Sequence, residues 1–131
     1  MFPMAKPWIF VAMISYKIIV MEYTASHKKT ICISEKNGTS ILSLQDIVRM
    51  EADSNYTKIY LKNSKSILVS KVLKSFEDQG ERNGFLRIHR SHFINVAFID
   101  EVIDNKLIRL FDGTTLNISR SRQKWVTEYF S

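Results

Sequence analysis

The sequence predicts a mostly β domain with two short helices. Short runs in which apolar and polar residues alternate, such as residues 56–62, recur over most of the chain and are typical of half-exposed strands. Turn signals separate these runs, and the strongest is Asp112-Gly113, a pair that favours a tight hairpin. Consecutive short strands joined by tight turns favour antiparallel pairing. Only the stretches that begin at Ser70 and Ser121 have helical spacing instead.

Length and composition indicate one folded domain with an anionic partner. The chain has 131 residues, 45% of them hydrophobic, with only 4 glycines and 2 prolines, which excludes a disordered chain. The 19 Lys and Arg residues against 13 Asp and Glu residues give a net charge of +6, which favours nucleic acid first and a membrane surface second. The single cysteine, Cys32, cannot form an internal disulfide and is expected to be a buried small hydrophobic residue, which fits a reducing cytoplasm.

Nine strands are expected between the turn signals. In the run 56–62 the tyrosines and lysines share one face, while Thr57, Ile59 and Leu61 share the other. This run is therefore expected to be a strand with a basic and aromatic outer face. The expected strands are residues 30–34, 41–44, 47–52, 56–62, 66–69, 85–88, 99–103, 106–111 and 115–118.

Two helices and one compact turn complete the expected elements. Ser70 can cap a helix that runs to about Gln79, and its apolar residues are Val72, Leu73 and Phe76. Residues 95–100 are expected to form a compact turn or a short helical piece, in which Asn95 has a structural role. The segment 121–130 is amphipathic, and its apolar stripe is interpreted as core packing; the stripe consists of Trp125, Val126, Tyr129 and Phe130.

Residues 1–29 fall outside this pattern and are expected to be an apolar extension and a linker, with the domain at residues 30–131. Residues 8–21 are strongly apolar, but this stretch is shorter than the roughly 20 residues that a membrane-spanning helix needs. Three interpretations stay open: an added element that packs on the domain or on a membrane or sensor partner, a membrane-associated anchor, or a true translation start at Met21.

The sequence contains no enzymatic signature and points to no cofactor. It has no Gly-rich phosphate loop, no Gly-x-Ser-x-Gly and no His-Glu-x-x-His motif. His89 and His92 are three residues apart and could be combined with Asp100 into a metal site, but a structural role for His89 in orienting the following turn is favoured. Glu51 has no paired acid and is expected to hold a turn or to pair with a cation.

Three expected loops carry the residue types that recognise duplex DNA. Arginine can donate to two acceptors of guanine and asparagine pairs with adenine, while phosphates are contacted by basic side chains, hydroxyls and backbone amides. The second loop is held between apolar segments, as a rigid binding loop would be. Lys71 would add a phosphate contact at the helix N-terminus. Arg49, Arg87 and Arg109 are interpreted as solvated strand faces, although Arg87 is close enough to the second loop to assist it. The loop residues are Asn55, Tyr56 and Lys58; Arg90, Ser91 and His92; and Arg120 and Arg122.

Three motifs occur in an order that resembles a known family. They are Glu-Ala-x-x-Asn-Tyr-Thr at residues 51–57, Phe-x-Arg-Ile-His-Arg-Ser-x-x-Ile-Asn at 85–95, and Asp-Gly-x-x-Leu-x-Ile-Ser-Arg at 112–120. Together they resemble the LytTR family, the DNA-binding domains of many bacterial response regulators. The resemblance extends over residues 40–130, and the order of three motifs makes it specific.

The resemblance implies small antiparallel sheets and contact with DNA from loops rather than from a recognition helix. It implies base reading by Asn55, Arg90 and Arg120, with pairs of domains on direct repeats of double-stranded DNA. Self-association on DNA would follow from such repeats. The family's usual N-terminal phosphoacceptor domain has no counterpart in the roughly 30 residues before the pattern, so a stand-alone transcriptional regulator without a cofactor is expected.

Two alternatives remain. The chain could be an interaction module that docks a membrane or a sensor protein through residues 8–21, with DNA binding weak or secondary. It could also bind single-stranded nucleic acid by stacking bases on Tyr56, Tyr60 or Phe93, which would be tolerant of sequence.

Overall fold

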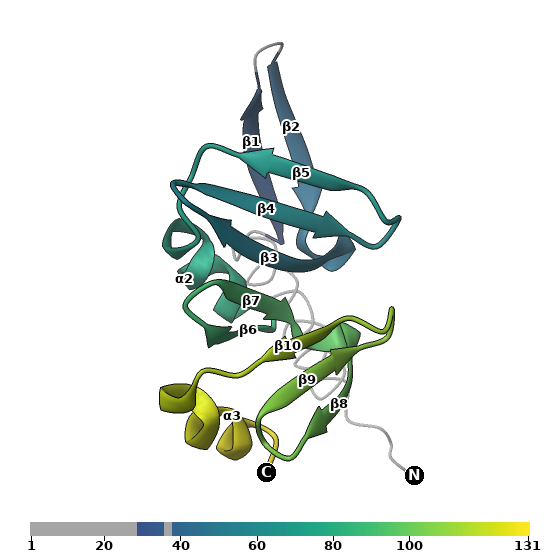
Figure 1. Ribbon diagram of the computed structural model, residues 1–131. Helices are drawn as coiled ribbons and strands as arrows, with labels where there is room; N and C mark the ends of the chain where they lie inside the picture. The colour runs from purple at the N-terminus through teal and green to yellow at the C-terminus, as the bar shows by residue number, and fades with distance from the viewer. Residues whose placement is uncertain (1–28, 36–37) are drawn as a thin grey trace, which may run out of the picture.

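The computed structural model describes residues 29–35 and 38–131 as a stack of three antiparallel sheets (Figure 1). The described strands are β1 (Thr30–Glu35), β2 (Gly38–Ser43), β3 (Ile47–Asp53), β4 (Tyr56–Leu61), β5 (Ser66–Val69), β6 (Phe85–His89), β7 (His92–Asn95), β8 (Ile99–Ile103), β9 (Leu107–Leu110) and β10 (Thr115–Asn117). The helices are η1 (Leu44–Asp46), α2 (Lys74–Arg82), η2 (Val96–Phe98), η3 (Arg120–Arg122) and α3 (Gln123–Tyr129), where η marks a 3-10 turn.

The five-stranded sheet is the middle layer. Its strand order is β5-β4-β3-β7-β6, so the hairpin β6–β7 joins the meander β3–β4–β5 through pairing of β7 with β3. The hairpin β1–β2 stands above this sheet in Figure 1, and the three-stranded sheet β10-β9-β8 lies below it. The prediction of a mostly β domain with small antiparallel sheets and two α-helices is confirmed for the described residues.

Alternation along the middle strands creates two cores, one on each face of the sheet. On β6, Phe85 belongs to the upper core and Leu86 to the lower one; on β7 the same division separates Phe93 from Ile94. Each buried apolar side chain of this size contributes roughly 1.5–3 kcal/mol through removal from water. The upper core also contains residues of β1, β3, β4 and α2, and the lower core is closed by the three-stranded sheet and by Val126 of α3.

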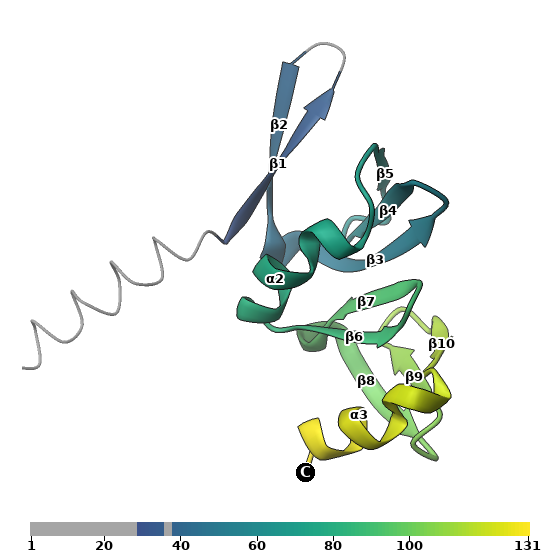
Figure 2. The ribbon, with the colours of Figure 1, turned by 90° about the vertical axis from the view of Figure 1, so that its left-hand side faces the viewer.

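Helix α2 lies between the hairpin β1–β2 and the middle sheet (Figure 2). It presents Phe76 and Gly80 to the upper core. A Cβ atom at Gly80 would lie 2.2 Å from Cε2 of Phe93, so the helix and β7 approach as closely as they do only because residue 80 has no side chain.

The expected strand segments are all present. Two of them, residues 66–69 and 99–103, have the expected bounds, the others differ by one to three residues at one or both ends, and one further strand was not predicted. That strand is β7, which sequence reasoning treated only as a buried segment after a polar turn. The Asp112-Gly113 hairpin is confirmed: Gly113 has φ +91°, and the Asp112 carboxylate accepts a hydrogen bond of 2.8 Å from the Thr114 amide. Residues 96–98 form the expected short helical piece, η2.

The predicted start of the first helix at Ser70 is wrong, because α2 begins at Lys74. The hydroxyl of Thr57 donates a 2.7 Å hydrogen bond to the carbonyl oxygen of Lys71. This bond ties the chain to β4 three residues ahead of the first residue of α2. Leu73 is buried, but Val72 is 47% exposed and does not join the core face.

Two predictions of burial are also wrong. Cys32 is exposed, because Ile31 and Ile33 on either side of it point into the upper core and a strand alternates its faces. In the C-terminal stripe only Val126 is buried, whereas the three aromatic residues are each more than 40% exposed: Trp125, Tyr129 and Phe130. They contact one another, with ring centroids 5.1 Å apart for Tyr129 and Phe130.

The predicted extension, its linker and the three interpretations of residues 8–21 fall outside the described residues, apart from Lys29. Within residues 29–35 and 38–131, no helix has the length and hydropathy needed to cross a bilayer.

Candidate nucleic-acid interface

The three predicted loops lie along one edge of the molecule. The β3–β4 turn, the β6–β7 turn and the segment between β10 and α3 are found one below the other on the left in Figure 1. They come from parts of the chain that are far apart in sequence, around residues 54, 90 and 120. The fold therefore brings the three loops together along one edge of the molecule.

Main-chain hydrogen bonds connect these loops to each other. The Ala52 amide at the end of β3 donates to the carbonyl oxygen of Ser91 in the β6–β7 turn, at 2.9 Å. The Ser119 amide donates to the carbonyl oxygen of Ile88 at the end of β6, at 2.8 Å. The second loop is thus bonded to both neighbours, and the edge is a connected frame rather than three separate loops.

The first loop exposes Asn55 and Tyr56. The turn is tight, and Ser54 adopts a left-handed backbone with φ +54°, which a residue with a side chain adopts at an energetic cost. Tyr56 is 45% exposed and can meet a sugar or a phosphate. Lys58 is half-buried, with its Nζ 5.2 Å from the centroid of the Tyr60 ring, so the stem of this lysine lies along the sheet.

The second loop presents Arg90, which is exposed at the tip of the β6–β7 turn. His89 orients this turn as predicted: its Nδ1 accepts a 3.1 Å hydrogen bond from the Ser91 amide. His92 is half-buried, and its own Nδ1 is buried without a hydrogen-bond partner among the described residues. The two imidazole rings are 5.2 Å apart between centroids.

A charged cluster supports His92 from the neighbouring strands. Glu51 accepts hydrogen bonds from Arg49 at 2.9 Å and from the Tyr60 hydroxyl at 3.2 Å, and the Arg49 guanidinium lies 3.7 Å from the Tyr60 ring centroid. Burial acts to raise the pKa of Glu51, but Arg49 and Tyr60 outweigh it and hold that pKa below its ordinary value. Burial lowers the pKa of His92, and the Glu51 carboxylate opposes this only in part.

The third loop carries Arg120 and Arg122. Arg120 is exposed and opens η3, three residues after β10 ends at Asn117. Its backbone is nevertheless anchored, since Ile118 is buried in the lower core. Arg122 is half-buried and its Nη1 lies 3.4 Å from the carbonyl oxygen of Arg87, to which it donates.

Lys71 is exposed on the segment between β5 and α2, which descends along the same side of the molecule in Figure 1. It is not at a helix N-terminus, because α2 begins three residues later. The prediction that a helix N-terminus assists Lys71 in contacting a phosphate is therefore wrong. A phosphate contact by Lys71 would depend on the charge of its side chain and on the hydrogen bond that anchors its carbonyl oxygen.

Arg87 is not a solvated strand residue, but it does lie close enough to the second loop to support it, which was the alternative interpretation of this residue. The residue is only 8% exposed, and its side chain extends from β6 towards α2. Its Nε donates to the carbonyl oxygen of His89 at 2.9 Å, its Nη2 donates to that of Arg90, and its Nη1 contacts Glu77 Oε2 at 3.3 Å. Burial lowers the pKa of Arg87 and the Glu77 carboxylate raises it. A basic residue on the inner face of an alternating strand was the signal available for this role.

The two other strand arginines differ: the Arg49 side chain is only 12% exposed and pairs with Glu51, so its prediction as a solvated residue is wrong. Arg109 pairs with Asp100 and Glu101 on the three-stranded sheet, as a solvated strand residue would. Asn95 is buried and structural as predicted: it donates to the carbonyl oxygen of Ile47 at 2.9 Å and accepts from the Ala97 amide at 3.1 Å. Stacking of bases on Phe93 is excluded because this ring is fully buried.

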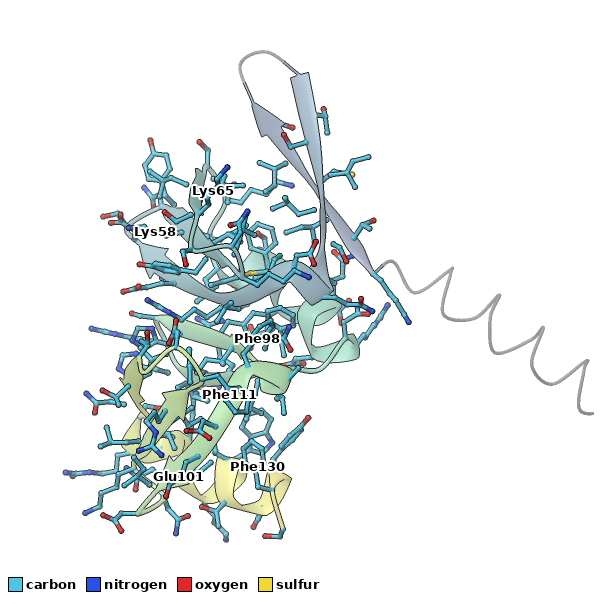
Figure 3. All side chains as sticks on the ribbon, turned by 90° about the vertical axis from the view of Figure 1, so that its right-hand side faces the viewer. Lys58, Lys65, Phe98, Glu101, Phe111 and Phe130 are labelled. Carbon is cyan, nitrogen blue, oxygen red and sulfur yellow. The ribbon has the colours of Figure 1, made fainter. Side chains whose placement is uncertain are left out.

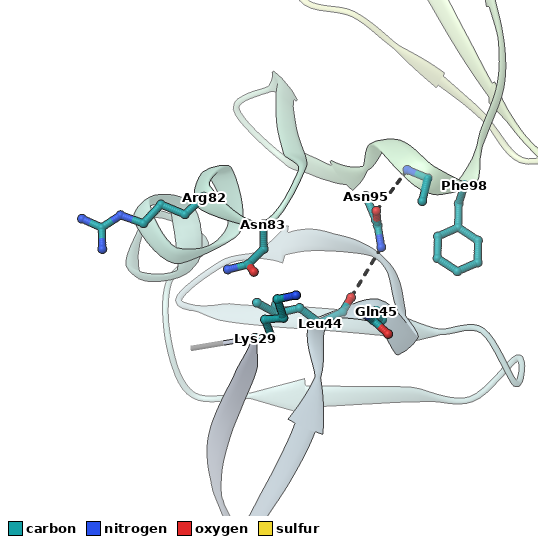
Figure 4. A pocket seen from close by; sticks show the side chains of 8 residues that line it. Lys29, Leu44, Gln45, Arg82, Asn83, Asn95 and Phe98 are labelled. Carbon is teal, nitrogen blue, oxygen red and sulfur yellow. Dashed lines mark hydrogen bonds between the residues drawn. The ribbon is translucent and has the colours of Figure 1, made fainter. Parts of the chain in front are cut away.

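Two hollows in the described part of the surface are lined by none of the residues assigned to the three loops. One of about 490 Å³ is lined by Lys29, Leu44, Gln45, Arg82, Asn83, Asn95, Ala97 and Phe98 (Figure 4). A second, of about 490 Å³, contains Lys65, Phe98 and Phe111, which Figure 3 shows on the side opposite the loops. No group of three His, Cys, Asp or Glu residues in the described part of the chain is arranged to hold a metal ion. The candidate interface is therefore an open surface of exposed polar side chains.

The exposed Arg and Asn side chains along this edge are the residue types that contact DNA, and they are carried by a β frame, as in a DNA-binding module. The family model of the LytTr DNA-binding domain matches residues 37–131, and the chain belongs to this family. The resemblance stated from the three motifs is thereby confirmed.

Known proteins share the fold and part of the sequence. The solved LytTr DNA-binding domain of a Bacillus cereus protein superimposes with a TM-score of 0.67 over 79% of this chain and 98% of that one, at 18% identity. The heme-containing CO-sensing transcriptional regulators RcoM 1 and RcoM 2 of Paraburkholderia xenovorans (strain LB400) are 30% and 29% identical over 101 residues. These matches cover 73% of this chain but only 38% of each relative, so the chain corresponds to a minor part of their length.

Proposed function

We propose that this chain is a transcriptional regulator that binds double-stranded DNA in a sequence-specific manner through its three edge loops. The observation that carries the proposal is the alignment of Asn55, Arg90 and Arg120, all exposed, on one hydrogen-bonded edge. The description of two relatives as transcriptional regulators supports the regulatory part. The net charge of +6 supports an anionic partner.

Base reading is assigned to three side chains, each from a different loop. Arg90 and Arg120 each have a free guanidinium that can donate to both guanine acceptors in the major groove, and Asn55 can pair with adenine. All three are exposed, and no hydrogen bond to another described residue holds any of their side chains to the surface. Because the loops lie one below the other along the edge, they can contact successive stretches of the major groove on one side of a duplex.

The remaining side chains act on phosphates or support the readers. Tyr56, Lys58, Lys71 and Ser91 lie within or beside the loops and offer hydroxyl or ammonium donors to phosphate oxygens. His92 and Arg122 are half-buried and bonded or packed within the frame, so their role is to hold the readers in place.

One module specifies little DNA, so we propose that two copies bind direct repeats. Each bidentate arginine–guanine contact contributes roughly 1–3 kcal/mol of discrimination, and three readers alone fall short of a useful genomic specificity. Two copies side by side would double the number of bases read. This self-association is expected on DNA and requires no contact between free copies.

The test is a selection from random duplex DNA with the full chain, repeated with Arg120→Ala and with Arg82→Ala. Arg82 is the matched control, because it is an exposed arginine on α2 that pairs with Asp78 and lies outside the loops. The expected result is a repeated motif for the wild-type chain and for Arg82→Ala, with one position of each half-site lost in Arg120→Ala. Enrichment of no motif above a salt-sensitive background would reduce the function to non-specific DNA binding.

A further inference from the structure

The buried guanidinium of Arg87 contacts two main-chain carbonyl oxygens in addition to the carboxylate that balances its charge. Its side chain is only 10% exposed and reaches past the end of β6 under the β6–β7 turn. Two of its donors are used on consecutive carbonyl oxygens, those of His89 and Arg90. The guanidinium is planar and its donors have a fixed spacing, so both peptide groups are held in one orientation relative to β6.

The orientation of these peptide groups decides what the second loop presents to a ligand. The carbonyl oxygens of His89 and Arg90 are directed inward onto Arg87, and that of Ser91 is directed inward onto the Ala52 amide. Three acceptors that would repel phosphate oxygens are thereby removed from the outer surface. The side chain of Arg90, which belongs to the same peptide segment, remains exposed.

Arg87 also connects this loop to α2 and to the third loop. Glu77 of α2 supplies the carboxylate that balances its buried charge, at 3.3 Å. The carbonyl oxygen of Arg87 itself accepts from Nη1 of Arg122 at 3.4 Å, two residues after Arg120. One residue thus contacts the backbone of the second loop with its side chain and the third loop with its main chain.

We propose that Arg87, anchored by Glu77, is a positioning residue that sets the placement of Arg90 for base reading and its spacing from Arg120. The inference rests on the proposed sequence-specific function and adds a residue that itself touches no DNA. Arg87 is covered by α2 and the loop, so it contributes to the choice of bases and not to the attraction of phosphates. The accuracy with which Arg90 reads its base in each half-site therefore depends on how firmly the Arg87 guanidinium holds the second loop.

The test compares Arg87→Lys with Arg109→Lys in the full chain. Lysine keeps the charge of Arg87 but cannot donate to two carbonyl oxygens in a fixed plane. Arg109 is the matched control, a strand arginine with two acidic partners on the three-stranded sheet. Duplex selection gives the base preference at each position, Arg90→Ala identifies the position read by Arg90, and hydrogen exchange reports on the amides of residues 90–92.

Arg87→Lys is expected to lower discrimination at the Arg90 position by roughly ten-fold, which is within the range of one bidentate contact. The slope of affinity against salt should stay unchanged, because no phosphate contact is removed. Exchange at residues 90–92 should become faster, and Arg109→Lys should change neither quantity. Should Arg87→Lys fail to fold, Glu77→Gln replaces it, with a smaller loss at the same position.

Two results would overturn the inference. In one, the folded variants keep the wild-type preference at the Arg90 position, whether or not exchange becomes faster. In the other, affinity falls by the same factor on every duplex, which is the result of a structural role alone. A wild-type chain that selects no motif is a different outcome: it removes the proposed function itself, and the inference with it.

Discussion

Thr57 on β4 donates its hydroxyl hydrogen to the carbonyl oxygen of Lys71, 14 residues later, at 2.7 Å. Thr57 is fully buried, so its hydroxyl cannot turn to water instead. This bond binds the segment between β5 and α2 to the middle sheet and fixes the point from which Lys71 projects.

Thr57→Val should therefore lower the free energy of unfolding by about 0.5–1.5 kcal/mol, because valine keeps the shape of the side chain but cannot donate this hydrogen bond. Urea unfolding of the variant beside Thr115→Val, an exposed strand position, is the measurement. Equal stability of Thr57→Val and the wild-type chain would show that the bond contributes nothing.

Gly80→Ala should destabilise the protein, although the same change normally stabilises a helix by about 1 kcal/mol. The new Cβ would meet Cε2 and Cζ of Phe93 at 2.2 and 2.4 Å, and this ring is fully buried. Such overpacking costs about 1–3 kcal/mol. A double-mutant cycle with Phe93→Leu checks the cause, since the smaller side chain should recover part of the loss. Additive effects of the two changes would place the strain elsewhere.

The stability of the protein should fall as the pH is lowered from 7 to 5, in part because of His92. Its pKa is lowered in the folded state, so the unfolded chain binds the proton more readily. The stability is complete above the ordinary pKa of about 6.5 and is lost as the pH falls through that value towards the lower folded pKa. Urea unfolding at pH 7 and pH 5 should show a smaller loss for His92→Gln. An identical loss in both proteins would contradict the assignment.

Lys71→Ala should weaken binding to all duplexes by a similar factor. It should also reduce the slope of log affinity against log salt by about 0.9, the value for one phosphate contact on duplex DNA. Lys65→Ala is the control, because this lysine lies in the β4–β5 connection on the opposite side of the molecule (Figure 3). Anisotropy titrations between about 50 and 200 mM salt measure both quantities. A loss confined to one base position would give Lys71 a base-reading role instead.

The strands were largely predictable because their signals are local. Alternation of apolar and polar residues and the Asp112-Gly113 turn depend only on neighbours in the sequence. The same alternation places Cys32 on the outer face of β1 between two buried isoleucines, so its exposure could have been deduced. Cysteine is usually buried in proteins, but at this position the alternation of faces along β1 outweighs that tendency.

The start of α2, the ion pair that accompanies the burial of Arg87 and the exposure of the C-terminal aromatic residues were not predictable locally. The first depends on the hydroxyl of Thr57, and the second on Glu77 of a helix that packs against β6. The third depends on how α3 meets the lower core, which accepts Val126 and leaves the aromatic rings outside. Each outcome is decided by a partner that is distant in sequence, and spacing along one segment contains no information about such a partner.

The three edge loops are joined to each other by main-chain atoms, through the Ala52 and Ser119 amides. Every amino acid except proline offers the same amide and carbonyl groups, so these bonds survive when the side chains beside them change. The residues at positions 55, 90 and 120 can therefore be exchanged without loss of the frame that carries them. Under the proposed function, a duplicated copy of this gene would acquire a new DNA target through a few substitutions at these positions, and the two copies would share one fold.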